Sequence, residues 1–374
     1  MKHFLYFLMF LVLPVQSYSQ SYPIFGNEIP VAINGLTFDA MEPFISPDGN
    51  MLLFNSLNDG INTSLYYATK INDSTFNFVG QVVGVNQSIS PHLDAVSSLD
   101  SANNFFWVST RDWPGITENL LRAGSNGASR VYGNFYIFSS GWIVMDAAIN
   151  YDGNYLYYCN ANFTGTSGGA PSEAKLGIAQ KVNDSTFNKI SNSDIILANI
   201  NDTNYIVYAP QVTKDGLELY FTRVSKITPQ TEICVSVRNS STANFSNPIV
   251  IYSNQPLTPE APTVTINKTI MYYHQKQGNI FKIFMRYRTG TTGIIEASRN
   301  DIISMFPNPS SGQVNITSSN NIDEVKITDL FGQIIYQTKT NEKNISLQLG
   351  KAGIYFVTLI SGKQAATKKI IVYR

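Results

Sequence analysis

The chain has 374 residues and is poor in charge, because only 14% of them are Asp, Glu, Lys or Arg, against roughly 25% in an average soluble domain. Its 26 basic and 26 acidic residues cancel, which excludes a nucleic-acid-binding protein that works through a basic surface. The composition also excludes a disordered charged tail. The length corresponds to about two domains, and an aromatic content of 12% with many Thr, Asn and Gly residues favours strands over helices.

The first 19 residues are typical of an export signal. Lys2 precedes the apolar run Phe4–Leu13, and the small residues Ser17 and Ser19 follow it, which is the order of a secretory signal peptide. The run is too short to cross a bilayer, since a spanning helix takes about 20 apolar residues. We expect residues 1–19 to be removed after export through the inner membrane, with an N-terminal anchor as the alternative, and we expect no transmembrane segment further along the chain.

The two cysteines, Cys159 and Cys234, each lie inside an apolar run typical of a strand. Two buried thiols that act as small apolar side chains are the favoured interpretation. A disulfide between them is the alternative, because an exported protein permits one.

The middle of the chain contains five related segments, the first being Glu42-Pro-Phe-Ile-Ser-Pro-Asp-Gly-Asn-Met-Leu-Leu-Phe54. Each segment has an acidic or amide anchor residue, and each anchor is followed six residues later by Phe or Tyr. This pattern predicts a short strand, a tight turn formed by the anchor, and an aromatic-rich strand. The anchors are Asp48, Asp100, Asp152, Asp215 and Asn267, at spacings of 52, 52, 63 and 52 residues.

Two further strands follow in each repeat, as at Ser64–Lys70 and Phe76–Val83. Four strands in about 50 residues make one blade of a β-propeller, so residues 20–296 are predicted to form a five-bladed propeller. The last repeat ends after three strands. We therefore expect Pro23–Ile33 to supply its fourth strand and to close the ring without an exposed edge.

The pattern Glu-Pro-x-Ile-Ser-Pro-Asp-Gly-x-x-Leu-x-Phe resembles the WD40-like PD40 repeat of TolB-type propellers, over residues 22–296. The second segment has Leu99-Asp-Ser where Pro-Asp-Gly is expected, and the fifth has Ile266-Asn-Lys. The resemblance implies a protein that binds or scaffolds rather than one with a known reaction.

Residues 297–304 are predicted to form a linker, and residues 305–374 have a different composition. Their short alternating strands include two hairpins, at 325–338 and 353–374, and predict a small Ig-like β-sandwich. This part resembles the type IX secretion sorting domain of Bacteroidetes-group bacteria. The residues that carry the resemblance include Pro307, Asn308, Pro309, Gly312, Gly332 and Gly353.

This resemblance implies a route rather than an activity. By the behaviour of the family, residues 305–374 interact with the type IX machinery, guide the chain across the outer membrane and are then removed by a sortase. The mature protein is expected to be attached to the outer surface or released.

The position six residues before each anchor is predicted to lie where the inner strands converge on the central channel. It holds Glu42, Asp94 and Asp146 in the first three repeats, and Glu260 lies one residue before the fifth such position. Three interpretations remain open: acids satisfied by backbone amides or basic side chains, a cation site suited to Ca²⁺, or the carboxyl groups of a glycoside hydrolase similar to the five-bladed arabinanases.

Other side chains are expected on the same face. Arg111 and Trp113 in the second repeat and Arg223 in the fourth are candidates to bind a sugar or peptide, although Trp113 is also suited to packing its own loop. His92 and His274 are expected nearby, but their spacing does not indicate a zinc site. The sequence contains no nucleophile elbow, phosphate-binding loop or dinucleotide fingerprint.

These observations predict an exported all-β protein whose propeller is a non-catalytic binding module for an unidentified glycan, peptide or protein. A secreted carbohydrate-active enzyme is the alternative. The residues between the signal peptide and position 305 hold 17 basic and 22 acidic side chains. The working part of the chain is therefore mildly acidic, which favours a cation, a basic group or a neutral glycan as the ligand.

Overall fold

The computed structural model describes residues 21–292 and 303–373, except residues 114, 125–126, 137–138, 140, 166–168, 330–331 and 362–363. The chain divides into two compact units, Met1–Gly293 and Ile294–Arg374. The predicted signal peptide lies outside the described residues, and so do residues 297–302 of the predicted linker, while Ile303 and Ser304 already belong to a strand.

The first unit contains five β-sheets, and each is built mainly from consecutive strands joined in antiparallel pairs. The first sheet contains β4 (Met41–Ile45), β5 (Met51–Asn55), β7 (Leu65–Asn72) and β8 (Thr75–Gln81). The second contains β9 (His92–Leu99), β10 (Phe105–Ser109), β11 (Leu120–Gly124) and β12 (Gly127–Arg130), with the short β6 (Asn62–Thr63) beside β9. The third contains β13 (Trp142–Ile149), β14 (Tyr155–Asn162), β15 (Glu173–Asn183) and β16 (Thr186–Lys189). The fourth sheet contains β17 (Tyr205–Val212), β18 (Glu218–Ser225), β19 (Thr231–Val237) and β20 (Ile249–Tyr252). The fifth contains β21 (Glu260–Val264), β22 (Ile270–Gln277) and β23 (Ile280–Thr292). A short helix, α1 (Ser193–Ile196), follows the third sheet.

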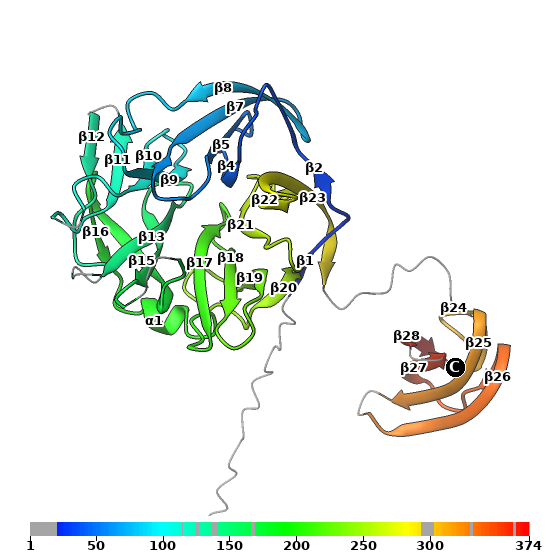
Figure 1. Cartoon of the computed structure of the whole chain (residues 1–374). Helices are drawn as coiled ribbons and strands as arrows, with labels where there is room; N and C mark the ends of the chain where they lie inside the picture. The colour runs from blue at the N-terminus through cyan, green and yellow to red at the C-terminus, as the bar shows by residue number, and fades with distance from the viewer. Residues whose placement is uncertain are drawn as a thin grey trace, which may run out of the picture. The chain divides into compact units, whose positions relative to one another are not determined.

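The five sheets form a ring with the first strand of each sheet on the inside (Figure 1). The inner strands β4, β9, β13, β17 and β21 pack side by side in that order, and β21 packs against β4 again. Apolar side chains fill the space between neighbouring sheets, as where Phe106 of the second sheet meets Phe187 of the third. This is the arrangement of a β-propeller. The repeat therefore predicted the architecture of this unit correctly.

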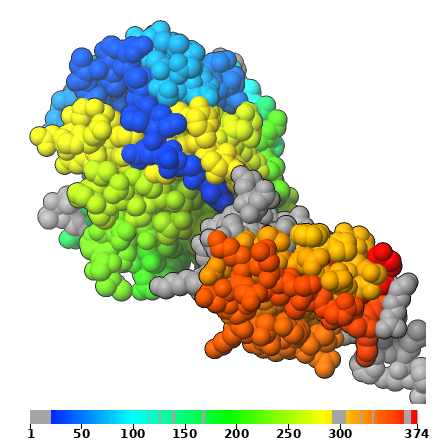
Figure 2. Space-filling model, turned by 90° about the vertical axis from the view of Figure 1, so that its right-hand side faces the viewer, coloured from blue at the N-terminus to red at the C-terminus, as the bar shows by residue number. Residues whose placement is uncertain are grey.

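The N-terminal segment closes the ring, and it does so across two sheets rather than one. Strands β1 (Tyr22–Phe25) and β2 (Ile29–Pro30) pair with β23, which confirms the predicted fourth strand of the last sheet. The next residues depart from the prediction, because β3 (Ala32–Asn34) leaves that sheet and pairs in parallel with β8 of the first sheet. Figure 2 shows this dark blue segment lying across the junction between the last sheet, in yellow, and the first, in lighter blue. Both ends of the repeat array are thus tied together by backbone hydrogen bonds.

Each inner strand has a β-bulge close to the channel axis, which disrupts its pairing with the second strand. In four sheets the bulge residue has a positive φ: Glu42 (52°), Val96 (52°), Ala209 (49°) and Ala261 (53°). A bulge turns one backbone amide out of its own sheet, and that amide needs another acceptor. The neighbouring sheet supplies it, since the amide of Ala261 donates to Thr222 Oγ1 at 2.9 Å and that of Val96 to Asn55 Oδ1 at 3.3 Å.

The predicted turns form at most anchors. Asp48 and Asp215 accept backbone amides two residues ahead and the hydroxyl groups of Ser46 and Thr213, and Asn267 has the same arrangement. The third sheet differs. There Asn150, two residues before the anchor Asp152, accepts the amides of Asn154 and Tyr155.

The cysteines are buried and unpaired, which confirms the favoured interpretation. Cys159 and Cys234 lie in the same apolar cluster, between the third and fourth sheets. The sulfur of Cys159 donates to the carbonyl of Val207 at 3.3 Å.

The second unit is one curled five-stranded sheet, not the two separate sheets of the predicted sandwich. Its strands are β24 (Ile303–Phe306), β25 (Gln313–Asp329), β26 (Ile334–Gln348), β27 (Gly353–Ser361) and β28 (Gln364–Val372). The predicted hairpins are present as β25 with β26 and β27 with β28. Bulges between Thr317 and Glu324 interrupt the pairing of β25 with β26, and side chains from both halves of β25, such as Val314 and Val325, share one apolar cluster. A single curled sheet therefore encloses the core that two sheets were expected to enclose.

No helix in the described part of the chain has the length and apolar character needed to cross a membrane.

The closure of the ring predicts a specific loss of stability. Arg286 on β23 donates to the carbonyl of Gly26 at 2.9 Å and to Tyr273 Oη at 3.1 Å, and its guanidinium lies 3.9 Å from the centre of the Tyr252 ring. We expect Arg286→Ala to lower the free energy of unfolding by about 2 kcal/mol, measured by urea denaturation. Lys282→Ala, an exposed change on the same strand, is the control, and equal stability of the two variants would show that the N-terminal strands do not depend on Arg286.

Candidate functional site

A cavity of about 360 Å³ lies on one side of the ring, where the five inner strands converge. We call it the axial cavity; Glu42, Asp146, Tyr208 and Glu260 are among the residues that line it. Beyond these acids the channel contains only a small space of about 30 Å³, which is lined by inner-strand residues of all five sheets. Glu42 lines both this space and the axial cavity. The acids therefore lie at the closed end of a cavity that opens towards one face.

Three of the four predicted acids come together here, and the fourth does not. Asp94 is fully buried in the second sheet, where it accepts hydrogen bonds from Trp107 Nε1 at 3.1 Å and the Gln87 amide at 2.7 Å. Its expected place in register with Glu42 is wrong, because the structural equivalent of Glu42 in that sheet is the bulge residue Val96. The hydrogen bonds that Asp94 needs are therefore supplied by its own surroundings. This agrees with the first of the three interpretations that the sequence left open for the acids.

The other three acids have few hydrogen-bond donors around them. Glu42 Oε1 accepts from Asn58 Nδ2 at 2.8 Å, Asp146 accepts the backbone amide of Ala209, and Glu260 accepts the hydroxyl of Tyr208. Two buried oxygens, Glu42 Oε2 and Asp146 Oδ2, have no hydrogen-bond partner among the described residues. No Arg or Lys is among the described residues that line the cavity.

His274 does not offset the charge of these acids. Its Nδ1 accepts the bulge amide of Glu42 at 3.0 Å, so the proton of the neutral ring lies on Nε2, 3.9 Å from Glu260 Oε2. Burial lowers the pKa of His274 to about 3, because the charged form is poorly solvated there. The histidine is therefore neutral at physiological pH.

Burial raises the pKa of each acid, and like charge adds to this effect. Desolvation brings the pKa of Asp146 to about 7 and that of Glu260 to about 7, with Asp146 also acting on Glu260. The pKa of Glu42 is raised well above its usual value by desolvation and by the other two acids. Near neutral pH the cluster consequently holds protons that exposed carboxyl groups would have lost.

The remaining predicted residues lie elsewhere and have partners of their own. Arg111 donates to the carbonyl of Val85 at 2.8 Å and lies 3.8 Å from Asp94. Arg223 pairs with Glu232 at 2.6 Å. His92 is buried, with Nε2 3.1 Å from Ser64 Oγ.

Trp113 is 39% exposed on the loop after β10 and is not among the described residues that line the axial cavity. None of these four side chains therefore belongs to the acidic cluster.

Sequence reasoning missed Tyr208 and Asn58. Tyr208 lies seven residues before the anchor Asp215, and Glu260 lies seven residues before Asn267. This shared register could have identified Tyr208 from the sequence. Asn58 follows β5 in a loop that no repeat pattern marks, so its contact with Glu42 depends on the fold alone.

The cation interpretation gains no support from this geometry. Of the three acids proposed for Ca²⁺, Asp94 lies outside the cluster, and among the described residues no group of three or more His, Cys, Asp or Glu side chains is placed to hold a metal ion.

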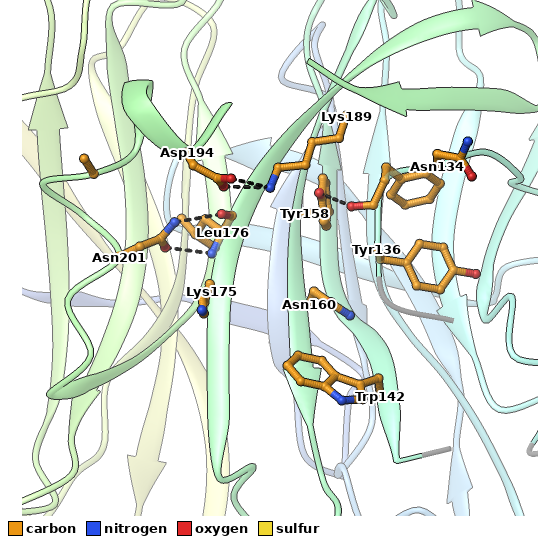
Figure 3. A pocket seen from close by; sticks show the side chains of 12 residues that line it. Asn134, Tyr136, Trp142, Tyr158, Asn160, Lys175, Leu176, Lys189, Asp194 and Asn201 are labelled. Atoms are coloured by element: carbon orange, nitrogen blue, oxygen red, sulfur yellow. Dashed lines mark hydrogen bonds and ion pairs between the residues drawn. The ribbon is translucent and has the colours of Figure 1, made fainter. Parts of the chain in front are cut away.

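A second and more open cavity, of about 610 Å³, is formed by the third sheet and the segments directly before and after it, and is lined by Trp142, Tyr136, Lys175 and Lys189, among others (Figure 3). Its charged groups are already compensated within the chain, since Lys189 pairs with Asp194 at 2.7 Å and Lys175 with Glu173 at 2.7 Å. Such a surface needs no ligand to neutralise it. The axial cavity is therefore the stronger candidate site.

The raised pKa values predict an unusual dependence of stability on pH. An acid whose pKa is about 7 when folded and about 4 when unfolded binds more protons in the native state between these values. Stability contributed by this acid is therefore lost as the pH rises from about 4 to about 7. We expect Asp146→Asn to raise the free energy of unfolding at pH 8 by about 1–3 kcal/mol and to flatten its fall between pH 5 and pH 8.

Urea denaturation at several pH values measures both effects. Asp194→Asn, which removes an exposed carboxylate from the second cavity, is the matched control and should leave the pH dependence unchanged. A native protein whose stability rises steadily from pH 5 to pH 8 would contradict the expected protonation of the cluster.

The sorting-domain motif has clear roles in the second unit. Asn308 fastens the segment after β24 to β28, donating to the carbonyl of Lys369 at 2.9 Å and accepting the Ile371 amide at 3.0 Å. Gly312 has φ 127°, and a side chain there would meet the carbonyl of Leu349. Gly332, with φ 80°, lies before β26, and Gly353 begins β27. The motif therefore specifies turns and strand contacts of this unit.

Comparison with solved structures gives only weak similarities. PorZ, a surface component of the type IX secretion system of Porphyromonas gingivalis, is 14% identical with a TM-score of 0.32, over 91% of this chain and 53% of its own length. An endo-arabinase from Bacteroides thetaiotaomicron is 13% identical with a TM-score of 0.43, over 69% of this chain and 96% of its own. A GH62 α-L-arabinofuranosidase domain from Coprinopsis cinerea is 10% identical with a TM-score of 0.48, over 73% and 99%.

No curated protein matches the chain. This chain spans about half the length of PorZ, and at these identities the similarities say nothing about activity. The family of secretion system C-terminal sorting domains, in contrast, matches residues 304–373. The chain is thus a β-propeller protein that carries a type IX sorting domain at its C-terminal end, which implies interaction with the type IX machinery and secretion or attachment to the outer surface.

Proposed function

We propose that the propeller is a non-catalytic binding module of the PD40 kind, presented on or released from the cell surface, and that it binds its ligand in the axial cavity. The observation that carries this proposal is the convergence of Glu42, Asp146 and Glu260 at the closed end of that cavity without an Arg or Lys partner among the described lining residues. Buried carboxyl groups without a cationic partner destabilise a fold, so their presence is better explained by binding than by structure.

Binding and catalysis are separated by one experiment. The secreted protein is applied to a glycan and peptide array, and any ligand found is then incubated with the protein and analysed by mass spectrometry. We expect a bound ligand that stays intact, and an affinity at least about tenfold lower for Asp146→Asn, since loss of one hydrogen bond to a charged group costs about 1.5–3 kcal/mol. The Asp194→Asn variant should bind as the native protein does, and unchanged binding by Asp146→Asn would place the ligand elsewhere.

Glycoside hydrolysis is the second candidate, and one observation favours it. A hydrolase needs one carboxyl group that stays protonated near neutral pH and a second that ionises, and the pKa values of Asp146 and Glu260 are both raised to about 7 by burial. Cleaved glycan that disappears in both Asp146→Asn and Glu260→Gln would support this function over simple binding.

The secretion route leads to a separate prediction. We propose that a sortase removes the sorting domain after the outer membrane is crossed. Deletion of residues 304–373 should therefore leave the propeller folded but retained inside the cell envelope, measured by immunoblotting of cell and culture fractions together with protease resistance. A full-length chain with Asp194→Asn is the control, and release of the truncated chain into the medium would show that another signal directs its export.

A further inference from the structure

The unpaired oxygens at the closed end of the axial cavity require hydrogen-bond donors. Asp146 is only 2% exposed, and its Oδ2 has no hydrogen-bond partner among the described residues. Three nearby donors are already engaged: the Ala209 amide with Asp146, the Tyr208 hydroxyl with Glu260, and the Asn58 amide group with Glu42. The Nε2–H of His274 is 3.9 Å from Glu260 Oε2, which is too far for a hydrogen bond. An ionised carboxylate only accepts hydrogen bonds, so once these acids ionise the missing donors have to come from water or from a ligand.

Every strand around this position contributes an acidic or a neutral group. Strand β4 supplies Glu42, β13 supplies Asp146 and β21 supplies Glu260, while Tyr208 on β17 and Cys159 on β14 keep their protons because burial raises their pKa values. The remaining titratable group, on β22, is the neutral His274 described above. The described surroundings thus hold up to three negative charges and no positive one.

The walls above the acids are largely apolar, which limits what can enter. Leu93, Val108, Val144, Met145, Phe163 and Ile206 are among the residues that line them. A volume of about 360 Å³ accommodates a short alkyl chain with a polar end. The cavity therefore combines an apolar wall with an acidic end that lacks donors.

We infer that the axial cavity binds the ammonium or guanidinium end of a basic ligand, with the alkyl part of that ligand against the apolar wall and the charged end between Glu42, Asp146 and Glu260. This inference rests on the proposed binding function and names the chemical class of the ligand. An alkylammonium supplies three donors and a guanidinium five, and either charge compensates acids that the chain itself leaves without a cation.

Binding of a cation must be linked to protonation. A cation favours the ionised acids, so carboxyl groups with pKa values near 7 in the empty cavity lose protons when the ligand enters. Affinity is consequently highest above pH 7 and falls by about tenfold between pH 8 and pH 6 for each proton released. A neutral ligand held by protonated acids lacks this dependence.

Two probes of equal length test the inference on the secreted protein: hexylamine, which is charged, and 1-hexanol, which is not. Isothermal titration calorimetry at pH 6 and pH 8, in two buffers of different ionisation enthalpy, gives the affinities and the number of protons released. We expect hexylamine to bind at least tenfold more tightly than 1-hexanol at pH 8, to release at least half a proton, and to lose that advantage at pH 6.

Variants assign the effect to the cluster. Asp146→Asn should reduce the affinity for hexylamine at pH 8 at least tenfold, Glu260→Gln should do the same, and Asp194→Asn should have no effect. Thermal unfolding verifies that each variant is folded, and the two cluster variants provide independent tests if one of them is not.

The outcomes separate this inference from the proposed function. Equal affinities of the two probes, or amine binding that is unchanged at pH 6 or in both cluster variants, would overturn the inference. If a neutral glycan from the array binds in an Asp146-dependent way and hexylamine does not, the binding function stands and the basic ligand is wrong. If neither the array nor hexylamine gives Asp146-dependent binding, both proposals fail.

Discussion

The propeller depends on the bulges of its inner strands. Strands that converge on one axis cannot all keep regular pairing, and a bulge lets each strand bend while turning one amide out of its own sheet. In this chain the neighbouring sheet accepts that amide, through His274 for Glu42, Asn55 for Val96 and Thr222 for Ala261. The same hydrogen bond thus satisfies a buried donor and joins two sheets, so ring closure and local backbone geometry are one constraint.

This constraint also creates the candidate site. The bulges bring Glu42 and Asp146 to the axis from different sheets, and Glu260, next to the bulge residue Ala261, follows them. Asp146 takes part in this closure, because it accepts the bulge amide of Ala209. Thr222 accepts the equivalent amide of Ala261 without any charge, so ring closure requires an acceptor but does not require the charge of the acids. Their burial costs stability above about pH 7, and that cost is the physical reason to connect them with a ligand.

The sequence allowed the ring to be predicted because each repeat combines a turn residue with an aromatic residue at fixed spacing. The prediction for Asp94 was wrong because it counted six residues back from Asp100. Asp100 occupies the first position of its turn, whereas Asp48 occupies the third position of the equivalent turn. A shift of two residues leaves the strand facing the same way, so periodicity cannot reveal it. The curled sheet of the second unit escaped prediction for a related reason, because strand patterns do not show which bulged strands bend over one core.

The formal charge of the propeller acquires a different meaning once the cluster is known. Three of its 22 acidic residues are Glu42, Asp146 and Glu260, and their raised pKa values mean that the empty cavity holds fewer negative charges than the sequence suggests. A neutral ligand leaves this protonation in place, whereas a cation exchanges its own charge for the protons that the acids release. Charge in the cavity is then nearly conserved on binding. A basic group can therefore enter a site that has no cation of its own among the described residues, and the release of protons distinguishes its entry from that of a neutral ligand.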